Sequence, residues 1–281
     1  MTTFRQQHDL LPGAVVSACS YDATGLEPGE HRGLPSPWLT LVVSLSGPVR
    51  TRGTVTDPGP VAASRATAYD VLVAGLHPVA ARVEQPEERS GVQLALHPLA
   101  ARRLLGCTAA ELTGIGQDGA DVLGAASREL HERLSEVPPA ARLPVVRGWL
   151  RERVAGSEDP HRHVVRPEVV RVWDLLAASR GRRRVDDLAR EVLLSPRRLR
   201  DLVRAEVGTG PKGLARAFRL DHAVELLAGG VGPADVAARA GYADQAHLAR
   251  DFTAAVGCSP TRWLAEERRN LQDGGHQNRP G

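Results

Sequence analysis

The chain has 281 residues, of which 42% are hydrophobic and 25% charged, and its formal net charge is +3. These values are ordinary for a globular protein, and no apolar run approaches the roughly 18 residues that a membrane span needs. The first residues lack the pattern of a signal peptide, and three widely spaced cysteines do not form a zinc motif of the CxxC type. A signal peptide, a membrane span and a CxxC-type zinc site are therefore not expected, and a cytoplasmic location is expected.

Residues 1–100 have the pattern of a β-rich segment. Short runs of β-branched and apolar residues alternate with turns that contain Gly or Pro. The clearest runs are Trp38–Ser46, Val71–Leu76 and Gly91–Leu96. Their spacing fits a small sheet or barrel. The histidines in this segment are isolated and lie near Pro or Gly, so a surface or loop role is expected for each of them: His31, His77 and His97.

Helical periodicity replaces the β pattern over residues 98–155. Helices are predicted over Pro98–Leu105, Ala109–Leu112, Val122–Leu134 and Ala140–Val154. Their apolar positions predict core residues at Leu130, Leu134, Val146, Trp149 and Leu150. A polar stretch with a proline, Gly156–Pro160, then has the composition of an interdomain linker. We therefore expect a first domain over residues 1–155 and a linker over 156–164.

Positive charge is concentrated after this linker. From His161 onward the chain has 21 Arg and Lys against 15 Asp and Glu, whereas the preceding residues have 15 against 18. Such a footprint is expected of a phosphate-binding surface, although Arg enrichment also follows from a GC-rich genome. Pro167–Ala178 is predicted to be the first helix of this domain. Arg182, Arg183 and Arg184 then form a basic turn, which is either a solvated surface or a phosphate clamp.

A helix-turn-helix pattern lies near the end of the basic domain. Pro233 suits the first turn of a helix, Gly241 suits a tight turn, and Asp244 is a good N-cap for a second helix. Leu248 and Phe252 are four residues apart on the inner face of that second helix. This pattern predicts a DNA-reading unit, with a plain helical hairpin as the alternative.

An upstream copy of the same pattern makes the plain hairpin the weaker alternative. Ser195 is the N-cap of the corresponding helix, Leu199 faces inward, and Lys212–Leu227 is predicted to connect the two units. Leu193 occupies the position that corresponds to Gly241. A positive φ at this leucine would cost roughly 1 kcal/mol, so the turn of the first unit is expected to be strained or reshaped.

The second unit also carries a family signature. It consists of Gly241–Leu248, Arg250, Phe252, Gly257, Pro260 and Trp263. These residues resemble the signature of the AraC family of transcription regulators. The upstream residues that resemble the rest of that DNA-binding domain are Ser195, Leu199, Gly208, Pro211, Arg219, Leu220 and Ala223. The resemblance places the DNA-binding domain at residues 165–268, and the polar residues 269–281 are expected to be a disordered tail.

The resemblance implies an α+β protein, with a β-rich, cupin-like N-terminal sensor domain and an all-α domain of tandem helix-turn-helix units. Relatives often dimerise through helices like those over 98–155, and a role that only closes the sensor domain is equally open. The implied function is a sequence-specific transcription regulator that responds to an unidentified small molecule and is not an enzyme. Implied partners are double-stranded DNA and the effector, with RNA polymerase and a second copy of the chain as further ones. No cofactor, catalytic residue or metal-binding residue is expected.

In such a domain the second helix of each unit lies in a major groove of DNA. There Arg can bind guanine, Gln adenine, Asp cytosine and Ala a thymine methyl group. By position in the family pattern, the residues that resemble DNA-contacting sites are Arg197, Arg198, Arg200, Asp201, Arg204, Gln245, Ala246, His247, Ala249 and Arg250. Weaker phosphate contacts are expected from Arg182, Arg183, Arg184 and Ser195. Relatives often have Arg at the position of Asp201, so their operators do not predict the one read here.

Two other functions are alternatives to a transcription regulator. An alkylation-response DNA methyltransferase-regulator needs a thiolate held in a four-cysteine zinc site, but only Cys19 and Cys107 lie outside the second domain. A sensor-less, nucleoid-type DNA binder would need more Lys and Arg and would leave the first domain without a role. The sequence therefore favours a transcription regulator over both alternatives.

Overall fold

Two antiparallel sheets form the N-terminal part of the structure, a computed structural model that describes residues 2–57, 66–112, 114–156 and 164–272. Within these residues one sheet has six strands: β1 (Thr2–Leu11), β2 (Val15–Ala23), β9 (Arg89–Leu96), β4 (Leu39–Ser44), β7 (Val71–Ala74) and β10 (Gln117–Asp118), in that spatial order. The other has four: β3 (Gly29–Gly33), β8 (Ala81–Gln85), β5 (Val49–Thr54) and β6 (Thr67–Tyr69). The predicted β-rich region is therefore confirmed, and its three clearest runs are β4, β7 and β9.

The alternation of side chains along β4 shows how the six-stranded sheet divides its two faces. Leu39, Leu41 and Val43 point into the main hydrophobic core of the first domain. Thr40 and Ser44 point to the other face, which lines a cavity between the two sheets. Because successive side chains of a strand point to opposite faces, one strand contributes both to the core and to the cavity wall.

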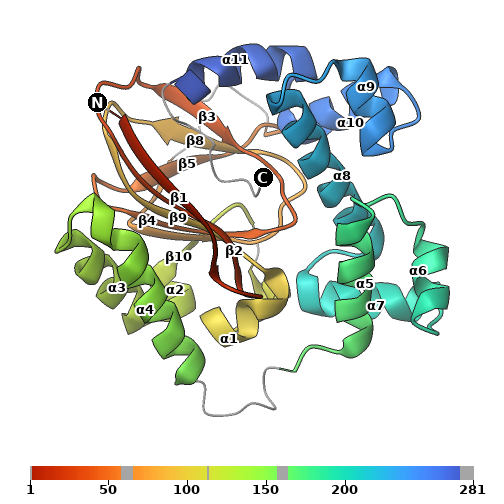
Figure 1. Cartoon of the computed structure of the whole chain (residues 1–281), viewed down its shortest axis with the longest axis horizontal. Coiled ribbons are helices and arrows are strands. Elements are labelled where there is room, and N and C mark those ends of the chain that lie inside the picture. The colour runs from red at the N-terminus through yellow and green to blue at the C-terminus, as the bar shows by residue number, and fades with distance from the viewer. Residues whose placement is uncertain (1, 58–65, 113, 157–163, 273–281) are drawn as a thin grey trace.

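Four helices pack on the core face of the six-stranded sheet, where Figure 1 shows α3 and α4 beside it. They are α1 (Ala101–Leu105), α2 (Gly119–Leu123), α3 (Ala125–Ser135) and α4 (Arg142–Ala155). The predicted core residues all belong to this cluster: Leu130, Leu134, Val146, Trp149 and Leu150. The helix predicted over Val122–Leu134 is interrupted at Gly124, whose φ of 61° and ψ of −137° are accessible mainly to glycine. Residues 109–111 form only a short 3-10 turn.

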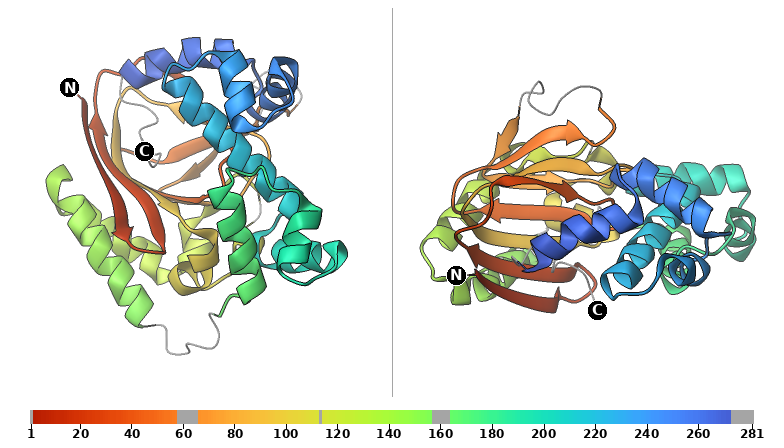
Figure 2. Two further views of the ribbon diagram at one scale, coloured as in Figure 1. Left: turned by 45° about the vertical axis from the view of Figure 1, so that its right-hand side comes forward. Right: turned by 90° about the horizontal axis from the view of Figure 1, so that it is seen from above.

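Seven helices make up the described part of the second domain. They are α5 (Pro167–Ala178), α6 (Val185–Glu191), α7 (Pro196–Val207), α8 (Pro211–Ala228), α9 (Pro233–Ala240), α10 (Gln245–Val256) and α11 (Pro260–Gln272). They surround two cores, one between α5 and α8 and one between α8 and α11. Helix α8 contributes Phe218 to the first core and Val224 to the second, so it is the shared support of both units, as the left view of Figure 2 shows.

The ends of the chain segments differ in part from the expected boundaries. Helix α11 continues to Gln272, beyond residue 268 where the domain was expected to end. The rest of the expected tail, 273–281, lies outside the described residues, as does most of the expected linker. Among the described helices none is long and apolar enough to cross a membrane.

Candidate nucleic-acid interface and sensor cavity

The first candidate reading helix, α7, has one buried and one exposed face. Leu199, Val203 and Val207 are buried in the core that it shares with α5 and α8. The candidate DNA-contacting side chains are all exposed: Arg197, Arg198, Arg200, Asp201 and Arg204. The Asp201 carboxylate lies 3.7 Å from Nε of Arg200, so it is placed to orient that guanidinium group. The helix starts at Ser195, whose Oγ accepts a hydrogen bond from the Arg198 N–H at 3.2 Å.

The second candidate reading helix, α10, also has one buried and one exposed face. Leu248 and Phe252 are fully buried, whereas Gln245, Ala246 and Arg250 are exposed and Ala249 is half-buried. His247 is also half-buried. Its Nδ1 accepts a hydrogen bond from the Ala243 N–H at 3.3 Å, and its ring lies edge-on to Tyr242 with the centroids 5.3 Å apart. These two contacts hold the His247 ring against the turn of the second unit.

A polar network that the sequence did not reveal fixes α10 on α8. The Arg216 Nε donates to Asp251 Oδ1 at 2.7 Å, and the buried Tyr242 hydroxyl donates to Asp251 Oδ2 at 3.2 Å. Burial raises the pKa of Tyr242, so its hydroxyl keeps the donated proton. Asp251 follows Arg250 in the chain, and the network therefore fixes the position of the helix that carries this candidate base-reading residue.

The two turns are not equivalent. Gly241 has a φ of 80°, and a Cβ there would lie 2.8 Å from Cγ of Arg182, so the basic turn packs against the second unit. Leu193 has a φ of 55° and is 92% exposed, which confirms the strain expected at the first turn. Arg182, Arg183 and Arg184 are exposed. The structure thus places the candidate phosphate clamp beside the turn of the second unit.

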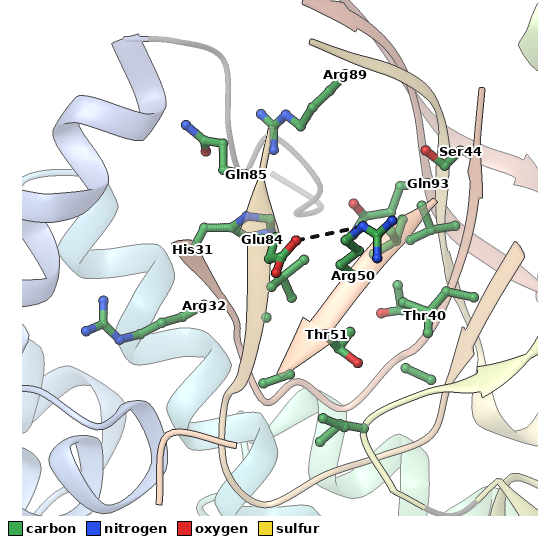
Figure 3. Close-up of a pocket in the computed structure, with 18 of the residues that line it drawn as sticks. His31, Arg32, Thr40, Ser44, Arg50, Thr51, Glu84, Gln85, Arg89 and Gln93 are labelled. Carbon is green, nitrogen blue, oxygen red and sulfur yellow. Dashed lines mark ion pairs between the residues drawn. The ribbon is translucent and has the colours of Figure 1, made fainter. Parts of the chain in front are cut away.

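A cavity of about 680 Å³ lies between the two sheets of the first domain. Figure 3 shows polar side chains from both sheets around it, among them Thr40, Ser44 and Gln93 from one sheet and Arg50 and Glu84 from the other. His31 also lines the cavity, so the expected surface role for this histidine is wrong. Asp221 of α8 is a further lining residue, and it is buried. The cavity therefore reaches the second domain.

The segment that connects β3 to β4 contacts the cavity and both helix-turn-helix units. Leu34 lines the cavity and packs against the core of the second unit. Trp38 lines the cavity and packs against the core of the first unit. Its ring centroid lies 5.6 Å from that of Trp173 and 6.1 Å from that of Phe218. These five residues, 34–38, form what we term the coupling segment.

His97 joins this aromatic contact between the domains. Its ring centroid lies 4.7 Å from that of Trp173 and 5.8 Å from that of Trp38. Burial lowers the pKa of His97 to about 4, against an opposing effect of Asp174, so the ring is neutral at pH 7. His97 lies in a loop, as expected, but a tertiary contact with Trp38 and Trp173 covers its ring, so the loop position is not a free surface position. His77 is also half-buried, with its Nδ1 2.7 Å from the Val79 carbonyl oxygen.

Further contacts join the first domain to the C-terminal ends of both candidate reading helices. Arg102 donates two hydrogen bonds to Glu206 of α7, at 3.0 and 3.2 Å. The Ala80 N–H donates to the Ala255 carbonyl of α10 at 2.7 Å. Arg32 of β3 forms an ion pair with Glu266 of α11, where Figure 1 shows α11 crossing above that strand. The candidate DNA-facing side chains lie outside these contacts.

The described residues contain no group of three or more His, Cys, Asp or Glu side chains placed to hold a metal ion. Cys19 lines the cavity, and burial raises its thiol pKa to about 11, against an opposing effect of Arg89. At neutral pH this thiol is protonated and a poor nucleophile.

Comparison with known proteins gives one domain family and several structures of similar fold. A helix-turn-helix domain family matches residues 188–266. No curated protein matches the chain in sequence. ToxT from Vibrio cholerae has a TM-score of 0.51 at 10% identity, over 94% of this chain and 98% of ToxT. ToxT from strain SCE256 with a bound unsaturated fatty acid gives 0.51 at 10%, over 90% and 95%. ToxT from strain O395 bound to (E)-4-(8-methylnaphthalen-1-yl)but-3-enoic acid gives 0.50 at 10%, over 94% and 98%. At these identities the likeness concerns the fold.

Proposed function

The chain is an AraC-type DNA-binding transcription regulator with its helix-turn-helix domain at residues 188–266, and we propose that it reads a specific DNA sequence and responds to a small molecule in the cavity. This family is one of regulators and not of enzymes. We also propose that it acts in the cytoplasm, where its cysteines would stay reduced.

The exposed faces of α7 and α10 support sequence-specific reading. Guanidinium, carboxylate, amide and methyl groups can each distinguish bases in the major groove. We propose base contacts for Arg197, Arg200, Asp201, Gln245, Ala246, Ala249 and Arg250. Phosphate contacts are proposed for Arg182, Arg183, Arg184, Arg198, Arg204 and Ser195, whose hydroxyl proton is not used by its N-cap bond. Two reading helices on one support helix would enter grooves about 34 Å apart, one turn of DNA.

The coupling segment is the single observation that best supports a response to a small molecule. A ligand in the cavity would touch Leu34 and Trp38, and each of them packs against the core of a different helix-turn-helix unit. The two ToxT structures with bound organic acids show that proteins of this fold hold small molecules. We accordingly propose that residues 1–155 are a sensor domain, 156–164 a linker and 165–268 the DNA-binding domain, since the core of the first part is separate from the two cores of the last.

Arg250→Ala tests the reading of bases. Loss of one bidentate contact should weaken binding to the preferred duplex by about 1–3 kcal/mol and remove the preference at one base position. Affinities for a set of duplexes that differ at single positions measure this. Arg182→Ala is the matched control, because loss of a phosphate contact should weaken all duplexes alike. If Arg250→Ala behaved like Arg182→Ala, Arg250 would be a phosphate contact and the proposed reading face would be wrong.

A further inference from the structure

We infer that the cavity binds an organic anion, with the acidic group on Arg50 and an apolar body that extends toward the coupling segment. The inference rests on the proposed function in that it takes the cavity as the effector site.

The charges around Arg50 leave a positive site in the cavity. Arg52 and Arg50 lie on the same strand, β5, and both face the carboxylate of Glu84 on β8. The Arg52 guanidinium is 2.5 Å from Glu84 Oε1, whereas the Nε of Arg50 is 3.9 Å from Oε2, as the dashed line in Figure 3 indicates. Two guanidinium groups thus share one carboxylate, which is committed to Arg52. The Arg50 side chain is 49% exposed and can form new hydrogen bonds.

The remaining charges around the cavity do not cancel this excess. Glu30 pairs with Arg82, which is not a lining residue, and Arg32 pairs with Glu266 outside the cavity. Arg89 lines the cavity, and its positive charge opposes the effect of burial on the pKa of Cys19 and Tyr21. The acidic Asp221 belongs to α8, on the side of the second domain. Arg offers a planar pair of donors that fits a carboxylate, phosphate or sulfonate.

The order of elements fixes the direction of the ligand. Strand β4 starts beside Trp38 of the coupling segment and ends at Ser44, and a turn at Gly47 leads into β5 with Arg50. Six residues of strand span about 20 Å, so Arg50 and Trp38 lie toward opposite ends of β4. Apolar lining residues continue between these ends, including Val42, Leu72 and Ala74. A ligand with its acid on Arg50 and an aromatic or aliphatic body would therefore reach toward the coupling segment.

Two fluorescent probes that differ only in an acidic group test this inference. The anion is 8-anilinonaphthalene-1-sulfonate, and N-phenyl-1-naphthylamine has the same skeleton without the sulfonate. The full-length protein should bind the sulfonate more tightly. Arg50→Gln should weaken sulfonate binding roughly tenfold, the effect of losing one charged hydrogen bond, and leave the neutral probe unchanged. Ala95→Phe places a large side chain in the cavity and should weaken the binding of both probes, which would show that both bind in the cavity.

Arg5→Gln is the matched control, because Arg5 is an exposed arginine of β1 that does not line the cavity. It should change neither affinity, and melting temperatures should show that each variant is folded. The inference is overturned if neither probe binds, if the neutral probe binds as tightly as the sulfonate, or if Arg50→Gln acts no differently from Arg5→Gln. Affinity for DNA is measured separately. If Arg50→Gln changed neither sulfonate binding nor the preference for one DNA sequence, the anion site would be rejected, whereas the proposed regulator function would be unaffected.

Discussion

Trp263→Ala should lower the free energy of unfolding of the DNA-binding domain by about 3–5 kcal/mol, the usual cost of removing a buried tryptophan. Trp263 is 2% exposed, and its ring centroid lies 5.8 Å from that of the fully buried Phe252. The pair holds α10 against α11, so the substitution leaves a cavity behind the second reading helix. Loss of DNA binding should follow from loss of the fold.

Urea unfolding followed by circular dichroism measures this change. Trp263→Phe is the control, since it keeps an aromatic ring in the same core and should cost much less. A Trp263→Ala protein that kept its stability and lost only DNA affinity would show that Trp263 contacts DNA, and the packing between Phe252 and Trp263 would then not be what supports α10.

Filling the cavity should change DNA affinity by roughly 5- to 150-fold, the usual range of coupling between two sites. Ala95→Phe imitates an occupied cavity, because Ala95 is buried and lines it. Because the Trp38 ring contacts Trp173 and Phe218, we expect Trp38 to transmit the effect to the core of the first unit. In a Trp38→Ala background the same filling substitution should therefore change DNA affinity much less.

A double-mutant cycle measures this coupling. It compares the affinity of the wild type, the two single variants and the double variant for one labelled duplex. Melting temperatures separate a change of affinity from unfolding. If Ala95→Phe shifted DNA affinity equally with and without Trp38, the coupling segment would not transmit occupancy. A folded Ala95→Phe protein with unchanged DNA affinity would contradict the proposed response to a small molecule.

The helices of the second domain could be predicted closely from the sequence because their signals are local. Pro167 and Ala178 bound the first helix as predicted, and the N-caps Ser195 and Asp244 both accept the expected backbone hydrogen bonds. Helical periodicity and capping depend on residues a few positions apart, and tertiary packing reinforced them here. The positive φ at Leu193 followed from a comparison of the two repeats.

The first domain and the cavity could be predicted only in outline. Strand β1 lies at the edge of the six-stranded sheet and contains few apolar residues. Its sequence therefore gives only a weak strand signal. The cavity brings together strands far apart in the chain, such as β4, β5 and β9, and spacing along the sequence does not reveal such contacts. The same limit hid the network of Arg216 with Asp251 and the burial of His97 between the domains.

Selection of binding sites from a random pool of duplexes by the full-length protein tests whether it reads a specific DNA sequence. We expect enrichment of one sequence with two conserved blocks about one helical turn apart, 34 Å, because α7 and α10 share the support helix α8. We also expect Arg250→Ala to lose the preference at one position in one block while the other block persists. Recovery of sequences without any shared preference, from a protein that still binds DNA, would contradict sequence-specific reading by these two helices.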